Sequence, residues 1–233
     1  MLCQLNLKSE YIENRMKRFL SYIWPITKRI ESAVNGTLEI TWINGKKILD
    51  TKNANYSYGS LQRILKFGLS KIEVTCTSDI LLLGFGAGSV VQTLREDFNF
   101  TGKITAIEYD NIMISVAEKE FNLASDDSLE IIVCDAFSYV NQTKETKGIV
   151  IIDLFIDKEV QPQCYSFNFW KSLVRLVETG GYVIFNAGFN QTEDIKLDEI
   201  IEEFKLAFDF HKHEKIENTN TLLIGRKLPP TRA

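Results

Sequence analysis

The chain has 233 residues, a formal net charge of −4 and a hydrophobic content of 45%, which suffices for one large domain or for one domain with a small appendage. The acidic balance argues against broad electrostatic binding to nucleic acid or to an anionic membrane. The apolar runs are too short to span a bilayer, no signal-peptide pattern opens the chain, and the four cysteines lack C-x-x-C spacing. We therefore expect a cytoplasmic protein without a membrane segment and without a metal site.

The N-terminal part predicts a short helix and then a β-meander. Apolar residues recur at helical spacing over residues 10–23, and Pro25 ends this helix. Two Asn-Gly pairs, at 35–36 and 44–45, predict two-residue type I′ turns, because both residue types tolerate the positive φ angles of such turns. The turns join three predicted strands, over 29–34, 37–43 and 46–50. We expect this meander to bind a partner or to form a homodimer rather than to carry the chemistry.

The second predicted unit, residues 58–233, follows the first, residues 1–57, through a polar connection over 53–58. Its predicted helices span 59–67 (ending at Gly68), 90–94, 111–121 and 167–177; a further short helix begins at 135–137, and another lies within 192–208. Its predicted strands span 80–83, 103–107, 129–133, 148–152, 182–186, 210–216 and 221–226. Strand–helix alternation argues for a mostly parallel sheet with helices on both faces, and the last two strands argue for an antiparallel hairpin. We therefore expect an α/β fold with a seven-stranded sheet.

A glycine-rich loop follows the first strand of this sheet. The apolar run over 80–83 leads directly into Gly84, Gly86 and Gly88, and a helix follows. Glycines let the backbone approach a ligand closely, and the free N–H groups at the start of the helix would face that ligand. Glu108, at the end of the next strand, is placed to accept hydrogen bonds from ribose hydroxyls. The stretch predicts a nucleoside-binding unit; the alternative is an α/β core with a glycine turn and no ligand.

Acidic residues also follow the next two strands of the sheet. Ligands of open α/β sheets lie outside the carboxyl ends of the strands, and here those ends carry Glu108, Asp135 and Asp153 beside the glycine loop. Asp135 is placed to accept from an adenine amino group, Ala136 leaves room for the ring, and Tyr109 would lie on the adenine face. Taken singly, each of these acids has the alternative role of a helix cap or a solvated loop residue.

The spacing G-x-G-x-G, with Ser89 where a dinucleotide fingerprint has its last glycine, resembles that of the class I S-adenosylmethionine-dependent methyltransferase fold, which is Rossmann-like. With the meander and the Glu-x-Asp element ending at Asp110, the pattern over roughly residues 28–190 resembles the spermidine synthase family. The resemblance implies a set of residues that bind S-adenosylmethionine or decarboxylated S-adenosylmethionine: Gly84, Phe85, Gly86, Gly88, Glu108, Tyr109, Asp135 and Ala136. It also implies Asp153 as the catalytic base that positions and deprotonates an acceptor amine, and Tyr58 and Asp157 as further residues of the acceptor site.

Three departures from the family pattern concern the substrates. The family carries an aspartate between its last two motif glycines, where it binds the amine of the decarboxylated cofactor, and this chain has Ala87. The second acceptor carboxylate, Asp157, is displaced by one position, and residues 50–55 are less acidic than the family connection. The first departure removes an electrostatic filter against the intact cofactor.

Three functions follow from this resemblance and its departures. We favour methyl transfer from intact S-adenosylmethionine to an unidentified small acceptor, for which an amine is one candidate. The second is aminopropyl transfer from the decarboxylated cofactor to a polyamine, as in spermidine synthases. The third is a nucleoside-binding or dimerisation module without turnover.

Overall fold

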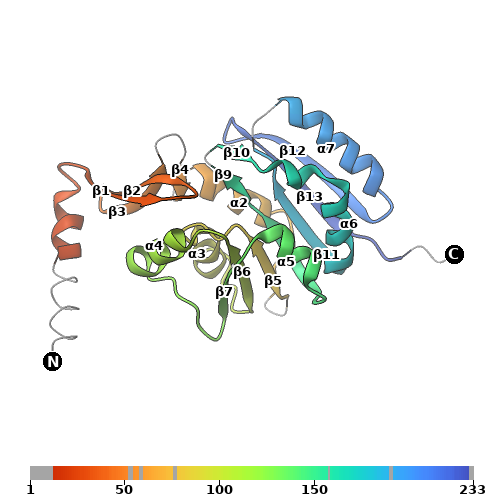
Figure 1. The fold of residues 1–233 in the computed structure, drawn as a ribbon, viewed down its shortest axis with the longest axis horizontal. Helices are drawn as coiled ribbons and strands as arrows, with labels where there is room; N and C mark the ends of the chain where they lie inside the picture. Colours follow the sequence, from red (N-terminus) through yellow and green to blue (C-terminus); the bar gives the residue numbers. More distant parts are fainter. Residues whose placement is uncertain are drawn as a thin grey trace.

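The computed structural model describes residues 13–51, 55–57, 60–75, 78–156, 158–188 and 191–230. Two predicted site residues, Tyr58 and Asp157, lie outside the described residues. Figure 1 shows an α/β body with a smaller sheet of N-terminal strands at one end, from which a helical segment projects. None of the helices in the described ranges combines the length and the apolar composition that crossing a bilayer requires.

The body is built on a seven-stranded sheet. Its strands are β5 (Ile80–Leu83), β6 (Ile104–Glu108), β7 (Leu129–Val133), β8 (Lys147–Ile152), β11 (Val177–Asn186), β12 (Phe208–Ile216) and β13 (Asn220–Lys227). Their order across the sheet is β12-β13-β11-β8-β5-β6-β7. The strands from β11 to β7 in that order are parallel, and β13 pairs antiparallel with both β11 and β12. The predicted α/β fold, with its mostly parallel sheet and antiparallel C-terminal hairpin, is confirmed.

Helices cover both faces of this sheet (Figure 1). They are α2 (Ser60–Leu69), α3 (Ser89–Glu96), α4 (Asn111–Phe121), α5 (Ala136–Gln142), α6 (Phe167–Leu176) and α7 (Gln191–Phe204), with a 3₁₀ turn, η1, at Pro162–Tyr165. In β5, Leu81 and Leu83 pack with residues of α5, α6 and α7, whereas Ile80 and Leu82 pack with residues of α2, α3 and α4. Alternate residues of a strand point to opposite faces, so the unbroken apolar run of β5 supplies two cores at once.

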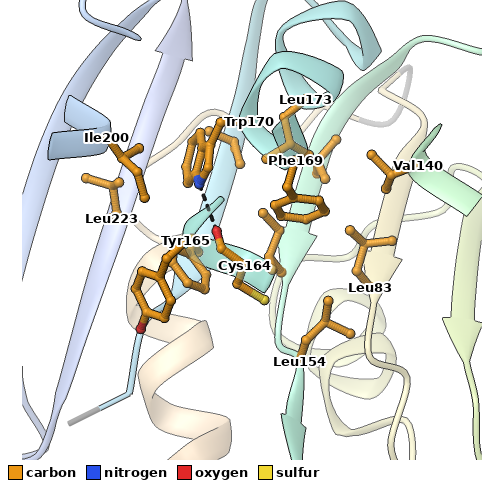
Figure 2. Close-up of a cluster of buried hydrophobic side chains, with 14 of the residues drawn as sticks. Leu83, Val140, Leu154, Cys164, Tyr165, Phe169, Trp170, Leu173, Ile200 and Leu223 are labelled. Atoms are coloured by element: carbon orange, nitrogen blue, oxygen red, sulfur yellow. Dashed lines mark hydrogen bonds between the residues drawn. The ribbon is translucent and has the colours of Figure 1, made fainter. Parts of the chain in front are cut away.

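The core beneath α6 is centred on aromatic side chains. Trp170 is fully buried, and its indole Nε1–H donates to the carbonyl oxygen of Cys164 at 2.9 Å (Figure 2). Its ring lies edge-on to Phe185 of β11 and to Phe208 of β12. This hydrogen bond satisfies the one polar atom of the largest buried side chain, which makes its burial favourable.

The end of one helix differs from the sequence prediction. Gly68 was expected just beyond the helix, but it lies inside α2, which runs to Leu69. A side chain at Gly68 would meet Leu222 and Ile184 at 3.0–3.1 Å, so the glycine allows close packing of α2 on the sheet. Helix α7 ends at Phe204, within the stretch predicted to contain it, and Phe208 begins β12.

The N-terminal sheet has four strands, one more than predicted. They are β1 (Ile26–Ser32), β2 (Gly36–Ile43), β3 (Lys46–Thr51) and β4 (Asn55–Ser57), paired antiparallel in chain order. The polar stretch expected to be a plain connection thus contributes β4. A polar composition does not prevent a strand at a sheet edge, where one side of the backbone pairs and the other is free for solvent.

The two Asn-Gly turns of this sheet are not alike. Asn44 and Gly45 have φ angles of 49° and 73° and close a two-residue turn between Ile43 and Lys46, which confirms the predicted type I′ turn. At the first turn Ser32 pairs with Gly36 across a three-residue loop, so the prediction of a two-residue turn was wrong. The Ser32 hydroxyl accepts from the backbone N–H groups of Val34 and Asn35, both at 3.0 Å, and this stabilises the longer loop.

The N-terminal sheet packs on α4 and on the glycine loop. A buried apolar cluster joins the two parts and consists of Leu38, Ile40, Leu49, Ala87, Met113 and Val116. On its rim Glu120 of α4 pairs with Lys28 and Lys47 at 2.8 and 2.9 Å. The division of the chain after residue 57 stays a prediction, and the sheet meets the body through a continuous apolar contact.

Candidate active site

A cleft of about 190 Å³ opens at the carboxyl ends of the parallel strands. Its walls include eight of the residues predicted to form the site: Gly84, Phe85, Gly86, Glu108, Tyr109, Asp135, Ala136 and Asp153. They come from the ends of β5, β6, β7 and β8, which are neighbours in the sheet. These residues were predicted to lie together because each stands at or near the carboxyl end of a parallel strand, and in the structure they do line one cleft.

Two glycines of the loop are required for different reasons. Gly84 has a φ of +91°, and a side chain there would meet the carbonyl oxygen of Asp153 at 2.2 Å. Only glycine therefore allows the loop after β5 to pass so close to the end of β8. Gly86 has a φ of +56°, and a side chain there would meet nothing within 4 Å, so its backbone faces open space in the cleft.

Four N–H groups of this loop are bonded inside the protein, and the prediction that N–H groups at the start of the next helix face a ligand stays a prediction. The N–H groups of Gly84 and Phe85 both donate to the carbonyl oxygen of Ile107 at 3.0 Å. The N–H of Gly86 donates to Glu108 Oε2 at 2.9 Å, and that of Gly88 donates to the carbonyl of Phe85 at 2.9 Å. These four N–H groups serve to shape the loop, and the loop offers a ligand space rather than those hydrogen-bond donors.

Gly88 and Ala87 lie behind the cleft wall. Gly88 precedes α3 with a φ of +81°, and a side chain there would meet Leu123 at 2.3 Å, so this glycine serves close packing. Ala87 is 1% exposed and its methyl group packs in the apolar cluster beneath the N-terminal sheet. In the present backbone conformation, an aspartate side chain at position 87 would enter that apolar cluster. The family pattern alone did not indicate this orientation.

Glu108 is the organising carboxylate of the cleft. Its Oε1 accepts from the N–H groups of Tyr109 and Asp110, and its Oε2 from Gly86, each at 2.9 Å. Burial raises the pKa of this carboxyl group, while the three backbone donors oppose that rise. The side chain is thereby held rigidly at the end of β6, and Oε2 keeps one lone pair for a ribose hydroxyl, since each carboxylate oxygen has two.

Asp110, the second acid of the Glu-x-Asp element, has a structural role. It is 3% exposed, and its Oδ1 caps α4 by accepting from the N–H of Ile112 at 2.8 Å. Its Oδ2 accepts from the Ser32 hydroxyl and from Asn35 Nδ2, the latter at 2.7 Å. Asp110 therefore fastens the β1–β2 loop against the body, and this loop adds Val34 and Asn35 to the cleft wall.

Asp135 and its neighbours form another side of the cleft. Asp135 caps α5, with Oδ1 accepting from the N–H of Ser138 at 2.7 Å, so the capping role is present together with its place in the cleft. Ala136 is 6% exposed, and Tyr109 is 64% exposed at the mouth. A small residue beside a carboxylate and an exposed aromatic ring is an arrangement that suits a planar heterocycle.

Asp153, at the end of β8, belongs to a chain of hydrogen bonds. Its Oδ1 accepts from Asn186 Nδ2 at 2.9 Å, and Asn186 Oδ1 in turn accepts from Asn220 Nδ2 at 2.9 Å. Asp153 lines the cleft and is half-buried. This burial raises the pKa of Asp153 from 3.8 to about 6, and the bond from Asn186 opposes the rise. A carboxylate with such a pKa accepts protons near neutral pH.

Sequence reasoning missed Asn35 and Asn186. A signal for Asn186 was available, because it ends β11, the fifth parallel strand, just as Asp153 ends β8. No local pattern pointed to Asn35, whose place depends on how the N-terminal sheet docks. Within the part of the chain that the structure describes, no three His, Cys, Asp or Glu side chains are grouped as metal ligands.

The chain was compared with known proteins. Residues 63–214 match the Spermine/spermidine synthase domain. The polyamine aminopropyltransferase of Thermoplasma volcanium is 24% identical over 171 residues, which cover 71% of this chain and 57% of that protein. Two further polyamine aminopropyltransferases, from Aquifex aeolicus and Sulfolobus acidocaldarius, are matched over 23% and 40% of their lengths. The chain thus spans less than two thirds of these relatives.

Two solved structures share the fold. Human methyltransferase-like protein 13, in complex with SAH, has a TM-score of 0.62 and 18% identity, covering 76% of this chain and 86% of that one. A probable spermidine synthase from Corynebacterium glutamicum has a TM-score of 0.61 and 16% identity, covering 87% and 77%. The fold and the family are those of transferases that use S-adenosylmethionine or its decarboxylated form. Because the domain match covers more than half of its residues, the chain belongs to the spermine/spermidine synthase domain family.

Proposed function

We propose that the protein transfers the methyl group of intact S-adenosylmethionine to a small acceptor, with Asp153 as the base. We choose the intact cofactor because of where the acidic residues lie around the cleft. Among the residues that the structure describes, the acids that line it are Glu108, Asp135 and Asp153, and none belongs to the loop from Gly84 to Gly88. The loop thus has no carboxylate to attract the amine of the decarboxylated cofactor or to repel the carboxylate of the intact one.

The residues around the cleft fit an adenosyl group. Glu108 is held by three backbone donors where it can accept from a ribose, and Gly86 leaves the space above the loop open. Asp135 and Ala136 would hold the adenine, with Tyr109 on its face. When bound, the cofactor supplies a transferable methyl group on a positively charged sulfur.

The role of Asp153 follows from its surroundings. An amine acceptor is protonated near neutral pH and cannot attack until it loses that proton. Asn186 occupies Asp153 Oδ1, so the other oxygen, Oδ2, would accept the proton from the acceptor nitrogen. The raised pKa of about 6 makes this transfer more favourable than it would be for an ordinary aspartate.

The acceptor side of the cleft is largely apolar. Leu154 follows Asp153, and β9 (Phe155–Ile156) forms the adjoining wall. This strand pairs with β10 (Glu159–Val160) in a short hairpin that the sequence did not predict. Exclusion of water by such walls favours transfer to an acceptor nitrogen over side reactions. An acceptor with an aliphatic portion is the chemistry that these walls suit.

Aminopropyl transfer is the second candidate, and family membership favours it. The third, a nucleoside-binding or dimerisation module without turnover, predicts binding of S-adenosylmethionine but no product with any acceptor. The proposals of a cytoplasmic location and of no nucleic-acid partner rest on the composition and net charge of the chain, and the proposal of a homodimer rests on the N-terminal meander. An rRNA methylase from Streptococcus thermophilus shares the fold at a TM-score of 0.54, which concerns the fold alone.

Calorimetry with each cofactor form, followed by mass spectrometry of reactions with a panel of amines, tests the proposal. We expect tighter binding of intact S-adenosylmethionine and products heavier by one methyl group. The variant Asp153→Asn should bind the cofactor as the parent does and lose turnover at least about 100-fold. Preference for the decarboxylated form, with aminopropylated products, would replace the first candidate by the second.

A further inference from the structure

A second hollow, of about 800 Å³, lies between the N-terminal helical segment, the β2–β3 hairpin and α4. The helical part of this segment, residues 13–20, stands beside the N-terminal sheet (Figure 1). Within the part of the chain that the structure describes, no residue lines both this hollow and the cleft. Ligand pockets in proteins have volumes of roughly 300 to 1,000 Å³, so the hollow is large enough for a small molecule.

Basic side chains predominate around this hollow. Among the described residues that line it, five are basic and two are acidic. The basic residues are Arg15, Arg18, Lys46, Lys47 and Lys119, and we call the hollow that they line the basic groove. The chain as a whole has a net charge of −4, so this concentration of positive charge does not follow from its overall composition. A concave surface lined by one sign of charge attracts ions of the opposite sign.

One of the two acids of the basic groove, Glu120, is already engaged by lysines. Its Oε1 lies 2.8 Å from Lys28 Nζ, and its Oε2 lies 2.9 Å from Lys47 Nζ. Lys47 Nζ also donates to the backbone carbonyl of Glu120 at 2.8 Å and lies 5.0 Å from the centroid of the Trp42 ring. Lys47 and Glu120 therefore neutralise each other within the wall of the groove.

Three other basic residues of the groove have no acidic partner among the residues that the structure describes. Arg18, Lys46 and Lys119 are exposed and form no ion pair there. They come from the helical segment, from β3 and from α4, so they approach the groove from different sides. The second acid, Glu96, accepts from a neutral donor, Gln92 Nε2, at 2.8 Å. Positive charge thus remains in excess in the groove.

A buried hydroxyl group fixes the positions of two of these cations relative to each other. Ser21 is 2% exposed, and its hydroxyl donates to the carbonyl oxygen of Arg18 at 2.7 Å and accepts from the N–H of Gly45 at 2.9 Å. The carbonyl of Ser21 accepts from the N–H of Asn44 at 3.0 Å. The backbone of Arg18 is thereby attached to the turn that directly precedes Lys46. A site held in place before a ligand arrives loses less entropy on binding.

We infer that the basic groove binds a small molecule that carries a polyphosphate group. Such a group places several negative charges close together, which matches cations that approach one hollow from three elements. Arginine and lysine are both common phosphate ligands, the first through its planar donors and the second as a compact charge. An acidic peptide spreads its carboxylates along an extended chain and matches a compact hollow less well. Trp42 also lines the groove, where it offers an aromatic surface to the base of a nucleotide.

Calorimetric titration of the full chain with sodium tripolyphosphate, at neutral pH and low salt, tests the inference without reference to catalysis. We expect one site per chain with a dissociation constant below roughly 100 μM, and weaker binding at high salt because ions screen the charges. The double variant Arg18→Gln/Lys119→Gln should raise the dissociation constant at least about 30-fold. Lys46→Gln, outside the helical segment, should raise it in the same direction. Lys171→Gln, at an exposed lysine of α6 outside the groove, is the matched control and should bind as the parent does.

Titrations with GTP and guanosine identify the source of the polyphosphate group. Guanine compounds are used because adenine compounds are expected to enter the cleft. If GTP binds more tightly than tripolyphosphate and changes the tryptophan fluorescence, and Trp42→Phe removes that change, the ligand is a nucleotide. Equal affinities show that the groove recognises the phosphate chain alone.

Three results would overturn the inference. The first is a parent protein that binds neither tripolyphosphate nor GTP, or that binds guanosine as tightly as GTP. The second is an unchanged affinity in Arg18→Gln/Lys119→Gln, with circular dichroism showing that variant folded. The third is binding of a single-stranded oligouridylate without binding of tripolyphosphate, which would make the groove a site for an extended polyanion.

Discussion

Asn186 Nδ2 lies 2.9 Å from Asp153 Oδ1 and donates a hydrogen bond to it. The direction of this bond is fixed from the other side of the amide. The backbone N–H of Gly188, which can only donate, is directed at Asn186 Oδ1 at 3.3 Å. The nitrogen of the amide must therefore face Asp153. Since Asn186 is fully buried, it holds the Asp153 carboxylate in one orientation and favours its ionised form.

Replacing Asn186 by aspartate should move the pH dependence of activity. In Asn186→Asp a second carboxylate would stand beside the carboxylate of Asp153, and two such groups cannot both ionise easily. We expect the acidic limb of the kcat/KM profile, near pH 6 in the parent, to move upward by about one unit or more.

The control for this shift is Asn168→Asp, which adds the same charge at an exposed position on α6. It should leave the limb in place. Equal profiles for Asn186→Asp and the parent enzyme would contradict the role of Asn186, because a purely structural effect would lower activity without moving the limb.

Asp153→Asn should stabilise the protein at high pH. The native pKa of Asp153 is raised from 3.8 to about 6, so its protonated form favours folding. That contribution is complete below about pH 4 and is lost as the pH rises through 6. Above pH 7 the buried charge costs up to about 3 kcal/mol of unfolding free energy, which Asp153→Asn removes.

Thermal unfolding at pH 8 and at pH 4 checks this prediction. The melting temperature of Asp153→Asn should exceed that of the parent by several degrees at pH 8 and match it at pH 4. Asp127→Asn, at an exposed loop position, is the control and should change neither value. A lower melting temperature for Asp153→Asn at pH 8 would show that the carboxylate is held by favourable contacts.

Two substitutions of Asp135 separate its cap from its place in the cleft. Asparagine caps helices as well as aspartate, so Asp135→Asn should keep the bond from the N–H of Ser138 and the stability. Asp135→Ala should lose about 1 kcal/mol of unfolding free energy. If the carboxylate binds adenine, both variants should weaken S-adenosylmethionine binding by about tenfold in calorimetry. Unchanged affinity in Asp135→Asn would leave Asp135 as a cap alone.

Ala87→Asp should unfold the protein rather than change its cofactor preference. The Ala87 methyl group lies in the cluster with Leu38, Leu49 and Met113, where an unpaired carboxylate has no donor. We expect a loss of about 3 kcal/mol or more of unfolding free energy, measured in urea. Ala87→Ser, a smaller polar change, should cost less. A folded Ala87→Asp protein that prefers decarboxylated S-adenosylmethionine would show that the loop can turn this side chain into the cleft.

Several features of the site could be predicted because they depend on short stretches of chain. The apolar run of β5, the glycines after it and the acids that end β6, β7 and β8 lie in local sequence patterns. Residues that end neighbouring parallel strands lie close together, because the carboxyl ends of such strands meet at one edge of the sheet. The same rule applied to β11 would have added Asn186. The two Asn-Gly turns show the limit of local reasoning, because the hydrogen bonds of Ser32 decided the length of the first one.

The sequence by itself thus determined the α/β class, the glycine loop and the carboxylates that meet at the cleft. Only the tertiary structure decided that Glu108 takes the N–H of Gly86, that Ala87 faces the N-terminal sheet, and that Asn186 orients Asp153. It also decided that the segment ending at Trp24 turns its apolar side outward. The physical reason is common to all four features, because each depends on contacts between residues distant in the chain. The periodicity of a sequence shows which side chains share a face of an element, but it does not show which partner that face meets.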